Sequence, residues 1–144
     1  MAQTRNRTLY LIKRAEMAVR AGLERALRDV EVTPGQYTIL SLLAARADQS
    51  SAGLARRAGV TPQSMSETVA QLERKGLIER TENPEHRRIL HISLTEAGRT
   101  LLAQCEARVD TLEAELLEGL SEERIASLRD DLHAITQKSE LPKA

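Results

Sequence analysis

The chain has 144 residues, a formal net charge of zero at neutral pH and a hydrophobic fraction of 41%. This length suits a single domain, residues 1–144, and leaves no room for a separate catalytic domain. The single cysteine, Cys105, excludes an internal disulfide, and three scattered histidines provide no metal-ligand spacing, so we expect neither a metal nor a cofactor.

No apolar run approaches the roughly 18 to 20 residues of a membrane span. The N-terminus lacks the apolar stretch and small-residue cleavage site of a signal peptide, so we expect a cytoplasmic protein. The sequence offers no Ser-His-Asp set, no glycine-rich phosphate loop and no metal cluster. We therefore do not expect an enzyme.

Residues 4–30 carry apolar side chains at helical spacing and predict a long amphipathic helix. Thr33 and Pro34 are suited to begin a second helix, because threonine caps free N–H groups and proline needs no donor at the first position. The side chains expected to face inward are Leu9, Ile12, Val19, Leu23, Ala26 and Val30 on the first helix, and Tyr37, Leu40, Leu43 and Ala44 on the second.

Two short helices follow, and their spacing is typical of a helix-turn-helix. Ser51 is expected to cap the first, whose Leu54, Ala55 and Ala58 face inward and which ends at Gly59. Val60 is expected to plug the short connection. Thr61 and Pro62 then begin a helix that stops at Gly76. The alternative is an ordinary helical hairpin.

The helix after Thr61 has one packing face and one free face. Met65, Val69 and Leu72 fall on one stripe, and the opposite stripe holds Gln63, Glu67, Ala70 and Arg74. Short polar side chains allow a helix to enter a DNA major groove about 12 Å wide. Glu67 is repelled by phosphates but can accept a hydrogen bond from the amino group of cytosine.

Residues 77–80 and 89–94 are β-prone runs that flank a turn-forming, basic segment, residues 83–88. This pattern predicts a β-hairpin wing. An arginine at its tip can enter a narrow minor groove or clamp phosphate oxygens. The alternative is a solvated hairpin tip.

Both ends of the chain are predicted to be helical and apolar on one side. Thr95 is expected to cap a helix that ends at Gly119, and Ser121 a last helix. The inward residues expected there are Leu101, Leu102, Cys105, Val109, Leu112 and Leu116, then Ile125, Leu128, Leu132 and Ile135. The small core cannot cover all these faces, so we expect the terminal helices to interlock in a homodimer, the alternative being a monomeric bundle.

Charge is distributed unevenly along the chain. Residues 52–90 hold seven basic and five acidic residues, a net charge of +2, whereas residues 106–144 hold five basic and ten acidic residues, a net charge of −5. We therefore expect phosphate affinity to depend on a few well-placed arginines and on dimerisation.

The order LARRAGVTPQSMSETVAQLERKGLIER, then PEHRRILHISLTEAG, resembles the winged-helix core of the MarR family of bacterial transcription regulators. The resemblance covers nearly the whole chain. Arg88 occupies the position of the family's wing-tip arginine, and His86 stands where the family usually has aspartate. This substitution either loosens the wing or leaves the orienting role to Glu85.

The resemblance implies a mainly α fold with a small β-wing. The winged helix-turn-helix DNA-binding core would span residues 33–98, flanked by a helical dimerisation region, residues 1–32 and 99–144. It also implies a pocket for small aromatic or phenolic anions near the first, second and fifth helices. Tyr10, Lys13, Arg14 and Tyr37 are candidate ligand contacts. The alternative roles are core packing for a tyrosine and a solvated face or dimer salt bridge for Lys13 and Arg14.

The predicted function is sequence-specific binding of double-stranded DNA by a homodimeric regulator. We expect a repressor on a pseudo-palindromic operator, with half-sites about 34 Å apart, that a small ligand releases. The alternative is a winged-helix protein-interaction module without specific DNA binding. The residues expected to contact DNA are Gln63, Ser64, Ser66, Glu67, Arg74, Arg87 and Arg88.

Overall fold

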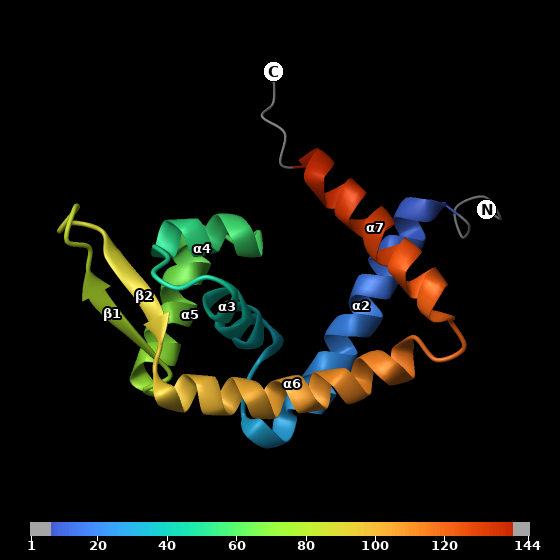
Figure 1. Ribbon diagram of the computed structural model, residues 1–144, viewed down its shortest axis with the longest axis horizontal. Coiled ribbons are helices and arrows are strands. Elements are labelled where there is room, and N and C mark those ends of the chain that lie inside the picture. Colours follow the sequence, from blue (N-terminus) through green and yellow to red (C-terminus); the bar gives the residue numbers. More distant parts are fainter. Residues whose placement is uncertain (1–6, 140–144) are drawn as a thin grey trace. The chain divides into compact units, whose positions relative to one another are not determined.

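The computed structural model describes residues 7–139, which fold into helices and one antiparallel hairpin (Figure 1). By their contacts, the residues divide into two compact units, Met1–Leu112 and Glu113–Ala144. The elements in chain order are α2 (Thr8–Leu27), the 3-10 helix η1 (Arg28–Val30), α3 (Pro34–Ala45), α4 (Ser51–Ala58), α5 (Pro62–Arg74), β1 (Ile78–Glu82), β2 (Leu90–Leu94), α6 (Glu96–Leu116) and α7 (Glu122–Ser139). The predicted fold class, mainly α with a small β-wing, is confirmed.

The first predicted helix is present as α2 and η1, and its expected start at residues 4–6 lies outside the described residues. Helix α3 begins with a full capping box. The Thr33 hydroxyl accepts from the Gln36 N–H at 3.1 Å, and the Gln36 side-chain oxygen accepts from the Thr33 N–H at 3.2 Å. These two bonds satisfy backbone donors that a helix start leaves free.

The cap of α4 was predicted one residue too late. The hydroxyl of Ser50, not Ser51, accepts from the Gly53 N–H at 3.0 Å. Two adjacent serines are equally good caps by residue type, and the extended backbone of Ser50 decides between them. The predicted cap of α5 is correct, since the Thr61 hydroxyl accepts from the Ser64 N–H at 3.1 Å.

The core lies among α3, α4, α5 and the hairpin, with contributions from the end of α2 and from α6. Its largest fully buried side chains include Leu27, Leu40, Leu54, Met65, Leu72 and Ile92. Within the helix-turn-helix and α3, two residues predicted to face inward are in fact exposed, Ala44 on α3 and Val60 between α4 and α5. Gly59 ends α4 in the left-handed conformation, with φ of 68°, and the chain leaves on the solvent side. The prediction that Val60 plugs the connection is therefore wrong.

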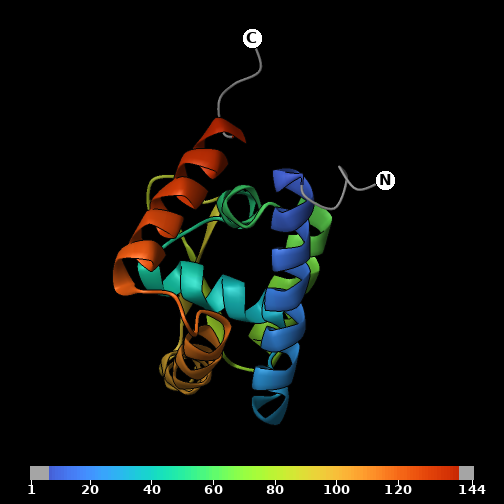
Figure 2. The same ribbon diagram turned by 90° about the vertical axis from the view of Figure 1, so that its right-hand side faces the viewer.

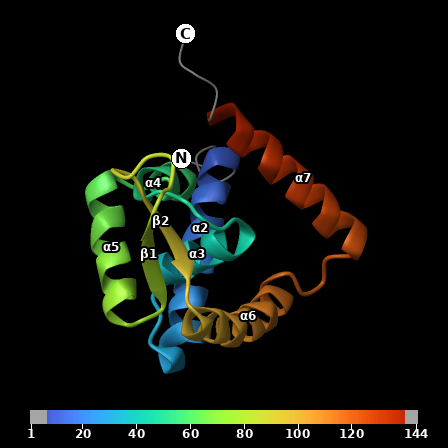
Figure 3. The same ribbon diagram turned by 60° about the vertical axis from the view of Figure 1, so that its left-hand side comes forward.

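The wing is a two-stranded antiparallel hairpin in which Ile78 pairs with Leu94 and Glu82 with Leu90 (Figure 3). Strand β1 runs two residues beyond the predicted 77–80. Buried Gln49 adds a further bridge, because its N–H donates to the Ile92 carbonyl at 3.4 Å and its carbonyl accepts from the Ile92 N–H at 2.8 Å. The Gln49 side chain also donates to the Leu42 carbonyl at 2.7 Å, which ties the end of α3 to β2.

The start of α6 is hydrogen-bonded to the chain that follows α5. The Thr95 hydroxyl donates to the Gly76 carbonyl at 2.6 Å and accepts from the Gly98 N–H at 3.1 Å, while the Thr95 N–H donates to the Leu77 carbonyl at 3.1 Å. A Cβ on Gly98 would lie 2.1 Å from the Leu77 oxygen. Only glycine therefore permits this close approach.

Helix α2 packs against α6 where Gly22 meets Leu112, and α3 runs across α2 (Figure 2). An ion pair of 3.4 Å between Arg108 and Asp29 joins α6 to η1. The N-terminal half of α2 has no such cover within this unit. Its exposed apolar side chains are Leu9, Tyr10, Leu11, Met17 and Val19.

The second unit holds the last residues of α6 and all of α7. The Ser121 hydroxyl accepts from the Arg124 N–H at 3.3 Å, as the predicted cap requires. Leu128, Leu132 and Ile135 are 39%, 43% and 44% exposed, so the apolar face of α7 is uncovered. No helix within residues 7–139 is long and apolar enough to cross a membrane.

Candidate nucleic-acid interface

Helix α5 has two chemically different faces, as its sequence predicts. Met65 and Val69 are 1% exposed and Leu72 is fully buried, so one face is fixed in the core. The candidate DNA contacts Gln63, Ser64, Ser66, Glu67 and Arg74 are all exposed, and Ala70 is half-buried among them. The structure thus brings five of the seven candidate residues onto one accessible helix.

The tip of the wing is built from two consecutive turns. The His86 N–H donates to the Asn83 carbonyl at 3.2 Å, and the Ile89 N–H donates to the His86 carbonyl at 2.9 Å. The Asn83 side chain also accepts from the Glu85 N–H at 2.9 Å, a local bond that asparagine favours in turns. Arg87 and Arg88 therefore occupy the two central positions of the second turn, in the loop that joins the two strands.

Both wing arginines are exposed, and in the described part of the chain neither forms an ion pair. The expected alternative, that Glu85 orients Arg88 in place of the missing aspartate, has no ion pair to support it there. The backbone turns hold the tip instead. The wing base is tied to α5 by an ion pair of 2.7 Å between Arg80 and Glu73.

Arg57 on α4 is exposed, but its guanidinium donates to the side-chain oxygen of buried Gln49 at 2.5 Å. Gln49 is thus bonded to α3, α4 and β2 at once. Sequence reasoning missed this residue, since a glutamine in a polar loop has no local pattern that marks it as buried. Its 7% exposure is the result of tertiary packing.

The four candidate ligand contacts are not gathered in one place. Tyr10, Lys13 and Arg14 lie exposed on the N-terminal half of α2, and Tyr37 is half-buried on α3 beside α6. Burial raises the pKa of Tyr37 above its ordinary value, and the nearby Glu106 carboxylate adds to this. Burial likewise raises the pKa of Cys105, which is fully buried and behaves as a core residue.

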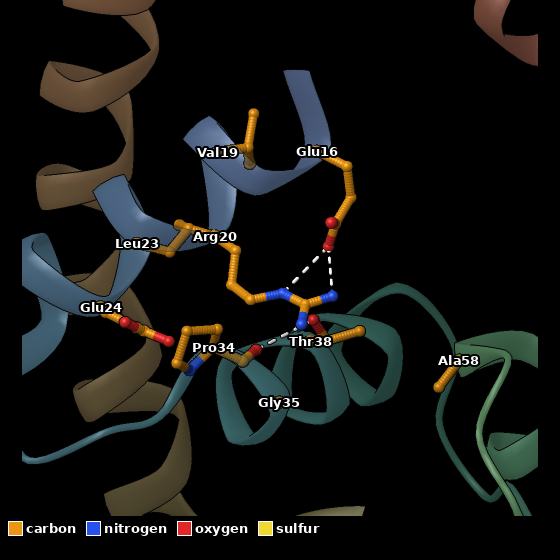
Figure 4. Close-up of a pocket in the computed structure, with 9 residues that line it drawn as sticks. All are labelled: Glu16, Val19, Arg20, Leu23, Glu24, Pro34, Gly35, Thr38 and Ala58. Atoms are coloured by element: carbon orange, nitrogen blue, oxygen red, sulfur yellow. Dashed lines mark hydrogen bonds and ion pairs between the residues drawn. The ribbon is translucent and has the colours of Figure 1, made fainter. Parts of the chain in front are cut away.

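Two hollows lie in the first unit, and neither is lined by those four residues. One, of about 480 Å³, lies between α2, α3 and α4, with Arg20 reaching over the first turns of α3 beside Glu16 (Figure 4). The other, of about 380 Å³, lies between α3, β2 and α6, with Arg99 and Glu106 as its charged residues. Within residues 7–139, no cluster of histidine, cysteine or carboxylate side chains could hold a metal ion.

A helix-turn-helix with an exposed polar second helix and an adjacent basic hairpin defines a winged-helix DNA-binding protein. The sequence model of the MarR family matches residues 30–89. A MarR-family transcriptional regulator from Rhodococcus sp. RHA1 is 31% identical, with a TM-score of 0.82 over 88% of this chain and 89% of that one. The chain therefore belongs to the MarR family; it is a DNA-binding transcriptional regulator and not an enzyme.

Two further structures are similar over nearly the full length of both chains. The transcriptional repressor CouR bound to a 23-mer DNA duplex is 29% identical, with a TM-score of 0.87 over 94% of this chain and 96% of that one. CouR from Rhodococcus jostii RHA1 bound to p-coumaroyl-CoA is 28% identical, with a TM-score of 0.84 over 96% of this chain and 95% of that one.

Proposed function

We propose that this regulator is a repressor that binds a pseudo-palindromic operator as a homodimer. The observation that carries this proposal is the exposed polar stripe of α5 beside a wing tip with two unpaired arginines among the described residues. Gln63, Ser64, Ser66, Glu67 and Arg74 would meet base edges and phosphates of the major groove. Arg87 and Arg88 would hold the minor groove or its phosphates.

The homodimer is supported by apolar surface that the chain leaves exposed. Leu9 and Met17 on α2 are 71% and 59% exposed, and α7 exposes a further stripe. Exposed apolar patches of this kind mark association surfaces. A two-fold dimer would present two copies of α5 to half-sites about 34 Å apart, that is, one turn of DNA. We also propose a cytoplasmic location, because the regulator would act on the chromosome.

We further propose that a small aromatic or phenolic ligand releases the operator. The hollow between α2 and α3 has the volume of a small-molecule site. Arg20 lies at its edge in an ion pair with Glu16, and an anionic group of the ligand would compete with that carboxylate for the guanidinium. The similar CouR binds p-coumaroyl-CoA, an aromatic acyl thioester. Tyr10, Lys13, Arg14 and Tyr37 stay predicted ligand contacts. A ligand that extends beyond the hollow would meet Tyr10, Lys13 and Arg14 on the surface of α2, whereas Tyr37 lies on α3 beside α6.

The test of DNA binding is a titration of the purified protein with the DNA that flanks its own gene, repeated over a range of salt concentrations. Tight binding that weakens with salt is expected, because phosphate contacts release counterions. Arg88→Ala is expected to weaken binding to most sequences and to lower the salt slope by about 0.9. Arg124→Ala, an exposed charge on α7, is the matched control and is expected to change neither.

Loss of binding in both variants, or in neither, would contradict the role of the wing. Absence of any binding at low salt would favour the protein-interaction alternative.

The ligand is tested by adding p-coumaroyl-CoA or p-coumarate to the preformed DNA complex. We expect the ligand to release the DNA from the unmodified protein and not from the Arg20→Ala variant. If the variant releases the DNA equally well, the ligand binds outside the hollow.

A further inference from the structure

Gln36 is a buried polar side chain that joins the start of α3 to the end of α5. It is only 5% exposed, so its amide requires partners inside the protein. Its oxygen accepts from the Thr33 N–H at 3.2 Å and from the Lys75 ammonium at 3.4 Å, and its nitrogen donates to the Gln71 side-chain oxygen at 3.1 Å. The capping glutamine of one helix therefore also holds the last turn of another.

Lys75 makes a second and shorter bond, to the connection between α2 and α3. Its ammonium donates to the Glu31 carbonyl at 2.9 Å. Glu31 follows η1 in the left-handed conformation, with φ of 56°, and is the point where the chain turns from α2 toward α3. One lysine side chain thus links the C-terminal end of α5 to this junction.

Gln71, in the last turn of α5, and Lys75, its C-cap residue, lie one turn apart beside the stripe proposed to meet DNA. Arg74, on that stripe, is the neighbour of Lys75 in the chain. The other side of α5 is held by apolar contacts of Met65, Val69 and Leu72. Apolar packing is non-directional, whereas hydrogen bonds have narrow preferences of distance and angle. The polar link is therefore the contact best suited to fix the rotation of α5.

We propose that Gln36 and Lys75 are positioning residues that set the orientation of α5 against the α2–α3 junction. Because α2 carries exposed apolar surface assigned above to the dimer, this link sets each recognition helix relative to its two-fold mate. It thereby fixes the half-site spacing that the protein accepts. The inference rests on the proposed function and adds a determinant of operator selectivity that touches no DNA.

The experiment starts from a duplex selected by the unmodified protein from a random-sequence pool. Affinity is then measured for this duplex and for versions with one base pair inserted or removed between the half-sites. Lys75→Met keeps the aliphatic stem and removes the ammonium. We expect it to reduce the preference for the selected spacing by about fivefold or more, with an unchanged salt slope.

A phosphate contact by Lys75 would give a different result. The salt slope would then fall by about 0.9, and all three duplexes would weaken equally, which would overturn the proposal. Arg87→Met is the matched control, because it removes a cation assigned to phosphate and is expected to lower the slope and leave the spacing preference intact. An unchanged spacing preference in Lys75→Met would also overturn the proposal.

Gln36 is tested by a pair of variants. Gln36→Met removes every side-chain hydrogen bond and is expected to reduce the spacing preference. Gln36→Glu is expected to restore it, because the carboxylate still accepts from Thr33 and Lys75, and the Gln71 amide can turn to donate. Equal loss in both variants would contradict the positioning role. If the unmodified protein selects no duplex at all, the proposed function itself fails.

Discussion

The winged core and the outer helices differ in the solvent exposure of their apolar side chains. In the core, Leu40, Leu54 and Leu72 are fully buried, and the helix starts are capped by Thr33, Ser50 and Thr61. On the N-terminal part of α2 and on α7, several apolar side chains of the same kind remain exposed, such as Leu9 at 71% and Leu132 at 43%. The core is thus complete within one chain, whereas the outer helices leave apolar surface that the proposed dimer would cover.

Charge separates the core from the C-terminal helices. Residues 52–90 have a net charge of +2 and residues 106–144 a net charge of −5, although the whole chain is neutral. Acidic helices near the C-terminus discourage contact with DNA, so the core presents a more favourable surface to phosphates than they do. Four predictions test whether the core is stable and reads DNA by its own contacts, and whether the terminal helices require a partner chain.

The largest effect is expected from Gly98→Ala, which places a Cβ 2.1 Å from the Leu77 carbonyl oxygen. Backbone must move to relieve this clash, and we expect a loss of about 3 kcal/mol in the free energy of unfolding, measured with urea. Gly35→Ala is the control, because the nearest atom to its Cβ would be 3.9 Å away. It is expected to stabilise α3 by up to about 1 kcal/mol. Equal effects of the two changes on the free energy of unfolding would contradict the close contact between Gly98 and the Leu77 carbonyl.

Leu132→Asp tests the uncovered face of α7. A carboxylate in an apolar dimer contact loses its water, and we expect the dimer to weaken by about 2 kcal/mol or more, with little effect on the folded core. Sedimentation equilibrium measures the change. Ala134→Asp, another exposed site on the same helix, is expected to leave the dimer nearly intact. A monomeric unmodified protein would refute the predicted interlocking of the ends.

Gln63→Ala tests the readout by α5 without a change in charge. We expect it to alter preference at one base step by about 1 to 3 kcal/mol, with an unchanged salt slope, because it removes a base contact and no phosphate contact. Competition between duplexes that differ at single positions measures the effect. A uniform loss of affinity over all duplexes would show that Gln63 contacts the DNA phosphate backbone and not a base.

The smallest expected effect concerns stability at alkaline pH. The pKa values of Tyr37 and Cys105 are raised in the folded state, mainly by burial, so the unfolded chain ionises first. Stability is therefore fully present below the ordinary thiol pKa of about 9 and is lost as the pH rises above it. Urea unfolding between pH 8 and 11 measures this decline, which Tyr37→Phe is expected to make shallower. A rise in stability over this range would contradict the assigned direction.

Much of the fold was predictable because its signals are local. Thr61-Pro62 and Thr33-Pro34 begin helices where expected, and Met65, Val69 and Leu72 are buried on the stripe predicted by the helical period. The errors have two different causes. Ser50 and Ser51 are indistinguishable by residue type, and the exposure of Val60 depends on the direction of the chain after Gly59, which the local sequence does not encode.

The sequence by itself determined the helix-turn-helix, the hairpin and the accessible face of α5, because caps, periodicity and turn residues act within a few positions. Only the tertiary structure decided the roles of Gln36, Gln49 and Gly98. Each of these acts on a residue far along the chain, on Lys75, Ile92 and Leu77 respectively. Such contacts depend on how the elements meet in space, and a residue's own type does not reveal its distant partner.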